Sequence, residues 1–327
     1  MSQPVRATAH ADAYAAARAR QNQLTKPPGA LGRLEDLACW LAGWQGREKP
    51  SLDRVVALVF AGNHGVCERG VAPFPQAVTA QMVANFEAGG AAINQLCRAY
   101  GADLRVIPLE LDRPTGDISR GPAMTADECA RAMQAGADAV PGSADLLLLG
   151  EMGIGNTTIG AALAAALLGG AGRDWVGPGT GLDDAGVRRK ASVVDEALAL
   201  HRDHLGDPQE VLRRLGGREQ AAMTGAILEA RRRSIPVMLD GFICCASALV
   251  ALRMDERGLD HCQVAHRSGE PGHARMVEAM GFAPILDLGM RLGEGSGAAM
   301  ALGVLRGAVA CHNGMATFAD AGVAGQG

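Results

Sequence analysis

Segment 145–168 constrains the fold of this chain more than any other segment. Residues 146–149 are four consecutive leucines, a short apolar run that predicts a buried strand. Residues 161–168 are rich in alanine and leucine and predict a helix. The sequence between them, 150–158, reads GEMGIGNTT. A strand, a glycine-rich turn and a helix start bring free backbone N–H groups and the helix dipole together, which favours a bound anion.

The residues after these glycines leave two interpretations open. Thr157 and Thr158 are expected to cap the helix and to supply hydroxyl donors. A tight turn that holds no ligand would have the same pattern, because glycine-rich turns are common between strands and helices. Taken alone, the turn is therefore either an anion site or a structural connection.

Several further apolar runs predict a parallel sheet. The runs 54–60, 103–109, 235–240 and 262–265 have the apolar character of strands buried on both faces. They alternate with helical stretches, and the connections are long enough for right-handed crossovers. The predicted fold class is α/β, with a Rossmann-like open parallel sheet flanked by helices. Segment 284–288 is either one more strand or the lead-in to a helix. Helices are expected at 8–23, 33–44, 78–100, 126–139, 161–168, from 183 onward, and at 218–233, 241–254 and 298–311.

The two ends of the chain differ from the middle. Residues 8–44 predict helix, loop and helix without a strand, because Pro27 and Pro28 must end the first helix. This section is expected to pack as a small helical unit. The tail 313–327 is small and polar and is expected to be partly disordered.

Composition excludes several classes of protein. With 31 Lys and Arg against 35 Asp and Glu, and 3% aromatic residues, the chain lacks the basic face and the stacking residues of a nucleic-acid binder. The apolar runs are too short for a membrane-spanning helix. The eight cysteines contain no C-x-x-C pair, which argues against structural zinc or a disulfide framework. Residues 1–22 lack the apolar core of a secretory signal, so we expect a cytoplasmic protein.

Four glycine-rich polar turns predict one binding site. Because the carboxyl ends of parallel strands meet at one edge, the turns 61–65, 150–158, 177–184 and 265–273 are expected to gather there. The chain has neither a G-x-x-x-x-G-K-S/T nor a strict G-x-G-x-x-G motif, which disfavours a nucleoside triphosphate and a dinucleotide. Metal-binding motifs such as H-E-x-x-H are also missing from the sequence. A monophosphate held by backbone N–H groups fits best.

The titratable residues of these turns each allow two roles. Glu151 and Glu294 either bond backbone amides or act as general bases whose pKa is raised in a partly dry pocket. His64 is a titratable candidate, although structural or solvated hydrogen bonds are the more usual role of a loop histidine. The run 188–190 is either a solvated helix face or a source of a cation for a phosphate.

The chain resembles the nicotinate-nucleotide–dimethylbenzimidazole phosphoribosyltransferases from residue 24 to about residue 312. Its motifs follow the family's order: LTKPPGALGRLE (24–35), FAGNHGV (60–66), VTAQMVANF (78–86), GEMGIGNTT (150–158), GTGLD (179–183), HRSGEPGH (266–273) and RLGEGSGA (291–298). The resemblance implies transfer of phosphoribosyl from nicotinate mononucleotide to 5,6-dimethylbenzimidazole. The products are α-ribazole 5′-phosphate, for the lower ligand of cobalamin, and nicotinate.

The resemblance also implies residue roles. Glu294 would take the benzimidazole N–H proton while the other ring nitrogen attacks C1′, and Glu151 would lie near the ribose and base. The leaving nicotinate is a cationic pyridinium, so that no metal and no other cofactor is expected. Phosphate and ribose are expected at Gly153, Gly155, Asn156, Thr157, Lys190, Ser268 and Gly269. The flat base is expected against Gln81, Met152 and Leu292.

The family fold implies a large α/β domain, residues 50–288, and a small helical domain made of 1–49 and 289–327. It also implies a homodimer. The chain departs from the family at Asn63, where many relatives carry Asp, and at Ala72, where Ser is frequent. The first departure leaves the catalytic assignment intact, whereas the second bears on how benzimidazole variants are discriminated.

Two other classes remain as alternatives. One is a catalytically silent protein of the same fold that binds a nucleotide or a benzimidazole; the intact motifs around Glu151 and Glu294 argue against it. The other is a phosphoribosyltransferase that uses a pyrophosphate donor. Such enzymes need acidic pairs at a strand end to hold magnesium pyrophosphate, and the sequence offers no such pair.

Overall fold

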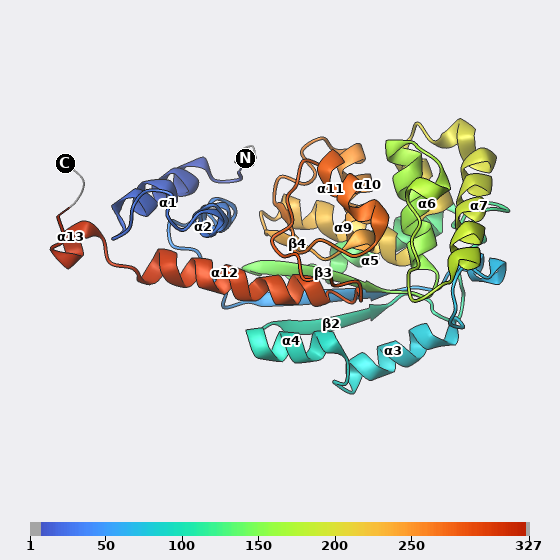
Figure 1. The fold of residues 1–327 in the computed structure, drawn as a ribbon, viewed down its shortest axis with the longest axis horizontal. Helices are drawn as coiled ribbons and strands as arrows, with labels where there is room; N and C mark the ends of the chain where they lie inside the picture. The colour runs from blue at the N-terminus through green and yellow to red at the C-terminus, as the bar shows by residue number, and fades with distance from the viewer. Residues whose placement is uncertain (1–7, 325–327) are drawn as a thin grey trace.

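The computed structural model describes residues 8–324 and is built on a five-stranded parallel sheet (Figure 1). The strand order is β2-β1-β3-β4-β5, one of the common doubly wound orders, in which the chain reverses direction across the sheet between β1 and β3. The predicted α/β class with an open parallel sheet is confirmed. The strands are β1 Val55–Ala61, β2 Asp103–Pro108, β3 Leu146–Met152, β4 Val237–Leu239 and β5 Cys262–Val264.

The central strands are apolar throughout because both faces of the sheet are covered. In β1, Val56, Leu58 and Phe60 belong to one core cluster, and Val55 and Val59 belong to the other. This alternation is the two-residue period of a strand. A continuous apolar run is therefore the sequence pattern that such a strand requires.

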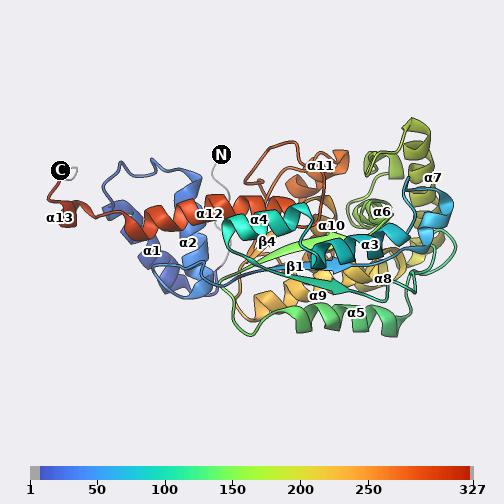
Figure 2. The same cartoon turned by 90° about the horizontal axis from the view of Figure 1, so that it is seen from below.

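Two layers of helices cover the sheet (Figure 2). The larger core cluster is shared with α5 Ala126–Ala139, α6 Asn156–Leu168, α7 Asp184–His201, α8 Pro208–Leu215, α9 Arg218–Arg232, α10 Phe242–Met254 and α11 Pro271–Ala279. The other cluster is shared with α2 Arg33–Gln45, α3 Ala77–Glu87, α4 Ala92–Tyr100 and α12 Ser296–Gly314. Short 3₁₀ helices occupy Gly65–Arg69, Gly172–Asp174 and Arg202–His204.

The two chain ends pack together through the long helix α12 (Figure 1). This helix runs beside β3 and continues past the sheet to α2 and α1, which spans Ala11–Gln23. His312 at its far end is buried, and its ring bonds Gln21 at 2.8 Å. An isolated antiparallel bridge also joins Leu24 to Thr317. The predicted helix-loop-helix start is confirmed, and the division into two domains remains a prediction.

The single helix predicted at 78–100 is wrong. The chain forms α3 and α4, separated at Gly89, which has a φ of +80°. The side chain of Asn94 stabilises this break, since its Oδ1 accepts from Ala91 N at 3.0 Å and its Nδ2 donates to Phe86 O at 2.9 Å. A left-handed glycine ends a helix readily, and the side chain of Asn94, the third residue of α4, bonds the N–H of the N-cap residue Ala91.

Three smaller predictions also need correction. Segment 284–288 is neither strand nor helix lead-in, but contributes an isolated parallel bridge between Leu286 and His266. The tail does not lose structure at residue 313, because α12 extends to Gly314 and a short helix, α13 Phe318–Ala321, follows. The expectation for 325–327 lies outside the described residues. Finally, α6 begins at Asn156 with Gly155 as its N-cap residue, so neither Thr157 nor Thr158 caps it.

The crossing of α5 and α9 depends on two glycines and gives a first prediction. A Cβ at Gly136 would lie 2.7 Å from Ala222 Cα, and one at Gly225 would lie 2.7 Å from Met133 C, so each helix approaches the backbone of the other. Gly136→Ala is expected to lower the free energy of unfolding by about 1–3 kcal/mol through overpacking. Urea unfolding should show a lower midpoint at an unchanged slope. The control is Gly307→Ala on α12, where a Cβ meets nothing within 4 Å; equal midpoints for both variants would contradict the close crossing.

Candidate functional site

A cavity lies at the carboxyl edge of the sheet, where β3, β4 and β5 end. Three of the four predicted turns contribute to it, together with the turn before α12. Loop 61–65 lies at the same edge of the sheet, against the turn at Gly153, but does not line the cavity. The lining residues are Glu151, Met152, Gly153, Ile154, Asn156, Thr157, Gly179, Thr180, Asp240, Gly241, Phe242, Ile243, His266, Ser268, Glu270, Arg291, Leu292 and Gly293.

Loop 61–65 instead supports the site from below. His64 is fully buried and its Nε2 lies 2.6 Å from Glu219 Oε1. A Cβ at Gly153 would lie 3.1 Å from each of these two atoms, so the pair packs directly under the glycine turn. The hydrogen bond of His64 is therefore structural, and the alternative of a solvated ring is wrong.

Glu151 is the next-to-last residue of β3; it is buried and lines the cavity. Its carboxylate accepts a hydrogen bond from Asn156 Nδ2 at the start of α6. Burial raises the pKa of Glu151 well above its usual range, and the nearby carboxyl group of Asp240 adds to the effect. The protonated form is therefore more favoured in Glu151 than in an exposed glutamate.

Glu294 lies in a left-handed turn that the glycines on either side make possible. Gly293, Glu294 and Gly295 have φ values of +83°, +64° and +80°. Glutamate rarely adopts such a backbone, and strain of this kind is concentrated at functional sites. The side chain is 6% exposed, and its Oε2 has no hydrogen-bond partner among residues 8–324. Burial raises the pKa of Glu294 to about 7, with a further contribution from Asp240.

A lysine lies behind the opposite wall of the cavity. Lys190 on α7 is 1% exposed, and its Nζ donates to Thr157 Oγ1 at 2.8 Å and to Gly177 O at 3.1 Å. Burial lowers the pKa of Lys190 to about 8, which the negative charge of Glu270 partly opposes. The lysine therefore links the loop before α7 to the first turn of α6.

Two loops meet over the cavity. Glu270 Oε1 accepts from Gly179 N at 3.1 Å, and Arg291 Nη1 donates to Gly179 O at 3.4 Å. The volume of this cavity is about 80 Å³. Sites for small ligands usually span about 300–1,000 Å³, so the cavity between these loops is small.

The structure brings most of the predicted site residues together and separates five from the cavity lining. Glu294 adjoins the lining residue Gly293, and Gly155 and Gly269 occupy the turns just behind the wall. Lys190 reaches the wall only through Thr157, and Gln81 is exposed on α3. The predicted residues that line the cavity directly are Glu151, Met152, Gly153, Asn156, Thr157, Ser268 and Leu292.

The two departures from the family pattern lie away from this cavity. Asn63 donates through Nδ2 to Leu111 O at 2.9 Å and borders a separate hollow beside Gln76 and Glu110. Ala72 is half-buried and is not one of the described residues that line the cavity.

Sequence reasoning missed Asp240, His266, Glu270 and Arg291. Asp240 follows the apolar run of β4 directly, so the rule that places polar groups at strand ends could have found it. His266, Glu270 and Arg291 lie inside motifs that were noticed for their glycines. Within the described part of the chain, no group of three or more His, Cys, Asp or Glu side chains is arranged to hold a metal ion.

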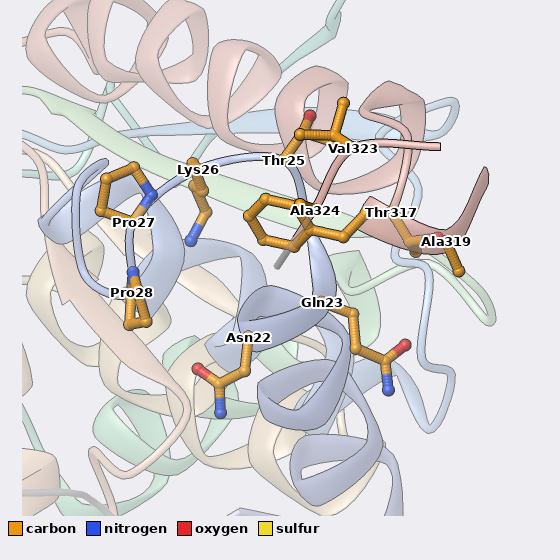
Figure 3. Close-up of a pocket in the computed structure, with 11 residues that line it drawn as sticks. Asn22, Gln23, Thr25, Lys26, Pro27, Pro28, Thr317, Ala319, Val323 and Ala324 are labelled. Atoms are coloured by element: carbon orange, nitrogen blue, oxygen red, sulfur yellow. The ribbon is translucent and has the colours of Figure 1, made fainter. Parts of the chain in front are cut away.

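A larger cavity of about 660 Å³ lies at the other end of the molecule (Figure 3). It is formed between the loop after α1 and the segment around α13, and none of the residues around it belongs to the cavity at the sheet edge. Its lining includes Asn22, Gln23, Lys26, Pro27, Pro28 and Thr317. None of the helices described is long and apolar enough to cross a membrane.

Comparisons with known proteins agree over nearly the whole chain. Residues 7–323 match the family described as "Phosphoribosyltransferase". Proteins named nicotinate-nucleotide–dimethylbenzimidazole phosphoribosyltransferase from Rhizobium johnstonii and Sinorhizobium medicae are 58% and 57% identical, and the matches cover 96% and 95% of this chain and 92% of each relative. The crystal structure of CobT from Thermus thermophilus matches with a TM-score of 0.91 at 45% identity, over 96% of this chain and 100% of that one. The chain therefore belongs to the nicotinate-nucleotide–dimethylbenzimidazole phosphoribosyltransferase family.

Proposed function

We propose that this protein transfers the phosphoribosyl group of nicotinate mononucleotide to 5,6-dimethylbenzimidazole. The products are α-ribazole 5′-phosphate, a component of the cobalamin lower ligand, and nicotinate. The observation that carries the proposal is the Glu294 carboxyl group, which follows the lining residue Gly293, is buried, and has one oxygen with no partner among residues 8–324; burial raises its pKa to about 7. A general base is most effective when its pKa lies near the working pH.

The proposed donor site is the first turn of α6. Gly153, Gly155, Asn156 and Thr157 present backbone and side-chain donors where the helix dipole is positive. Lys190 would hold Thr157 in place and add positive charge behind the phosphate. The remaining phosphate and ribose contacts are proposed at Ser268 and Gly269, and the base contacts at Gln81, Met152 and Leu292.

The proposed reaction needs one proton acceptor. One ring nitrogen of dimethylbenzimidazole attacks C1′ from the face opposite nicotinate, and the C1′–pyridinium bond breaks with both electrons going to the nicotinate nitrogen. The N–H of the other ring nitrogen loses its proton to Glu294. Glu151 is proposed to lie near the ribose and base, as the family resemblance implies, and its carboxyl group is held by a hydrogen bond from Asn156.

We also propose the wider organisation that the family resemblance implies. The chain is proposed to form a homodimer, with a large domain of residues 50–288 and a small one of 1–49 and 289–327. The packing of α1 and α2 on the far end of α12 supports this division. No two cysteines among residues 8–324 form a disulfide, which fits a reducing compartment such as the cytoplasm.

The test is turnover without metal. Purified protein incubated with nicotinate mononucleotide and dimethylbenzimidazole is expected to release nicotinate at the same rate with and without a chelator, because the pyridinium leaving group carries its own positive charge. Chromatography would follow nicotinate and α-ribazole 5′-phosphate together. Binding of both substrates without turnover would favour the silent binding protein, and loss of the rate in the chelator would contradict the metal-free reaction.

A further inference from the structure

Asp240 occupies a central place in the site that the family resemblance did not assign. It follows β4, borders the cavity and is 1% exposed. Its Oδ2 accepts from Gly295 N at 3.1 Å and its Oδ1 accepts from Ala298 N at 2.9 Å. These N–H groups belong to the start of α12, where the backbone donors have no partner within the helix. The N-cap residue Gly295 has no side chain, so Asp240, which follows β4, caps this helix in its place.

This cap also determines where the Glu294 turn lies. The turn is held on one side by the hydrogen bond from Gly295 to Asp240. On the other side it lies against β3, since a Cβ at Gly150 would be 2.6 Å from Glu294 C. The strained backbone of Glu294 is therefore held in place by Asp240, after β4, and by Gly150, in β3.

The charged groups around Glu294 come from several elements. Asp240 contributes a neighbouring carboxylate from β4, and Glu151 contributes another from β3. His266, after β5, has its Nε2 3.5 Å from Asp240 Oδ1. His273 on α11 lies behind it, with ring centres 6.4 Å apart, and Arg291 lies on the same loop as Glu294. Asp240 thus contacts both the ring of His266 and the N–H of Gly295 in the turn.

We infer that Asp240 is a positioning residue of the proposed reaction: it fixes the Glu294 turn through the first N–H groups of α12 and presents a negative charge to the Glu294 carboxyl group. The inference rests on the proposed function. It does not require Asp240 to contact the substrate, because each of its oxygens already accepts a backbone N–H from the start of α12. The contribution of Asp240 to the reaction is made through Glu294.

The decisive variant is Asp240→Asn, which keeps the shape and one acceptor oxygen but removes the charge. We expect kcat to fall about tenfold, as one charge-assisted hydrogen bond is lost and the turn loosens. A nearby like charge raises the pKa of a carboxyl group, so its removal should move the acidic limb of the kcat/KM profile to lower pH by about one unit. The KM for nicotinate mononucleotide should change much less than kcat.

The matched control is Asp145→Asn. Asp145 is also buried, but it lies at the opposite edge of the sheet, where it accepts from Arg54 N at 2.9 Å and pairs with Arg47. Its substitution should lower Tm and leave the pH profile in place. If Asp240→Asn does not fold, Asp240→Ser, which is smaller and keeps a neutral acceptor, should give the same shift of the acidic limb.

A second measurement does not depend on turnover. The carboxyl group of Glu294 can be titrated by NMR with ¹³C-labelled glutamate, assigned by its loss in Glu294→Gln. Its midpoint should fall by about one pH unit in Asp240→Asn. An unchanged midpoint and an unchanged acidic limb in a folded variant would overturn the inference. If the Glu294 midpoint falls in Asp240→Asn as expected but the wild-type protein shows no turnover, the proposed reaction is refuted and the positioning role of Asp240 stands.

Discussion

Replacing Glu294 with glutamine is expected to lower kcat for phosphoribosyl transfer by at least about 100-fold, the usual scale for removal of a general base. The amide has the size of the carboxylate but cannot accept the benzimidazole proton. The KM values should change little, because the backbone turn at 293–295 is kept. Release of nicotinate, followed by chromatography at saturating substrates, measures the effect.

The pH dependence adds a second readout of the same residue. With a pKa of about 7, Glu294 is protonated below neutral pH, and kcat/KM should fall about tenfold per pH unit there. Stability should change in the opposite sense. A carboxyl group whose pKa is raised by folding destabilises the protein as pH rises from its unfolded pKa to about 7, and this cost persists above that. Glu294→Gln should therefore have a higher Tm than the wild type at pH 8 and little difference at pH 4.

The control for Glu294→Gln is Glu278→Gln, which removes the same charge from an exposed position on α11. Its kcat and its pH profile should match those of the wild type. Near wild-type turnover in Glu294→Gln would contradict the assignment of the base. In that case the proton would leave to water, and the raised pKa of Glu294 would have only a structural cause.

Gly150→Ala is expected to have the second large effect, a loss of activity of about 100-fold, because small misplacements of a reacting group are costly. Gly150 lies in β3, and a Cβ there would be 2.6 Å from both Glu294 C and Gly295 Cα. The added methyl group must push the turn at 293–295 away from the sheet. Overpacking should also lower the free energy of unfolding by about 1–3 kcal/mol.

Activity and urea unfolding should be measured on the same preparation of Gly150→Ala. Gly307→Ala is the matched control, since it adds a methyl group to α12 in open space. It should keep full activity and the same or slightly higher stability. Full activity in Gly150→Ala would show that the turn at 293–295 can move without affecting the reaction, which would contradict the close contact between β3 and this turn.

Much of the fold could be predicted because the burial of a strand or helix determines which of its own residues are apolar, and this pattern can be seen in a short stretch of sequence. A strand buried on both faces must be apolar at every position, so runs such as 146–149 can be recognised as buried strands from the sequence. The break at Gly89 was missed because glycine is tolerated inside helices, and only the capping bonds of Asn94 show that the chain stops there. Helix α13 was missed because four residues carry too little periodicity, and it is stabilised by a capping box at Thr317.

Part of the candidate site could likewise be predicted from the sequence, and part could not. The sequence alone determined the parallel sheet, the glycine turns at its carboxyl edge and the candidate glutamates 151 and 294, because strand ends and glycine spacing are local features. Only the tertiary structure decided that Asp240 caps α12 from 55 residues away and that His64 lies beneath the glycine turn, bonded to Glu219. It also decided that Gly150 lies against Gly295. These contacts depend on how strands and helices pack in three dimensions. Hydrogen bonds and packing contacts between residues far apart in the chain produce no periodic pattern in a single sequence, so they cannot be read from it.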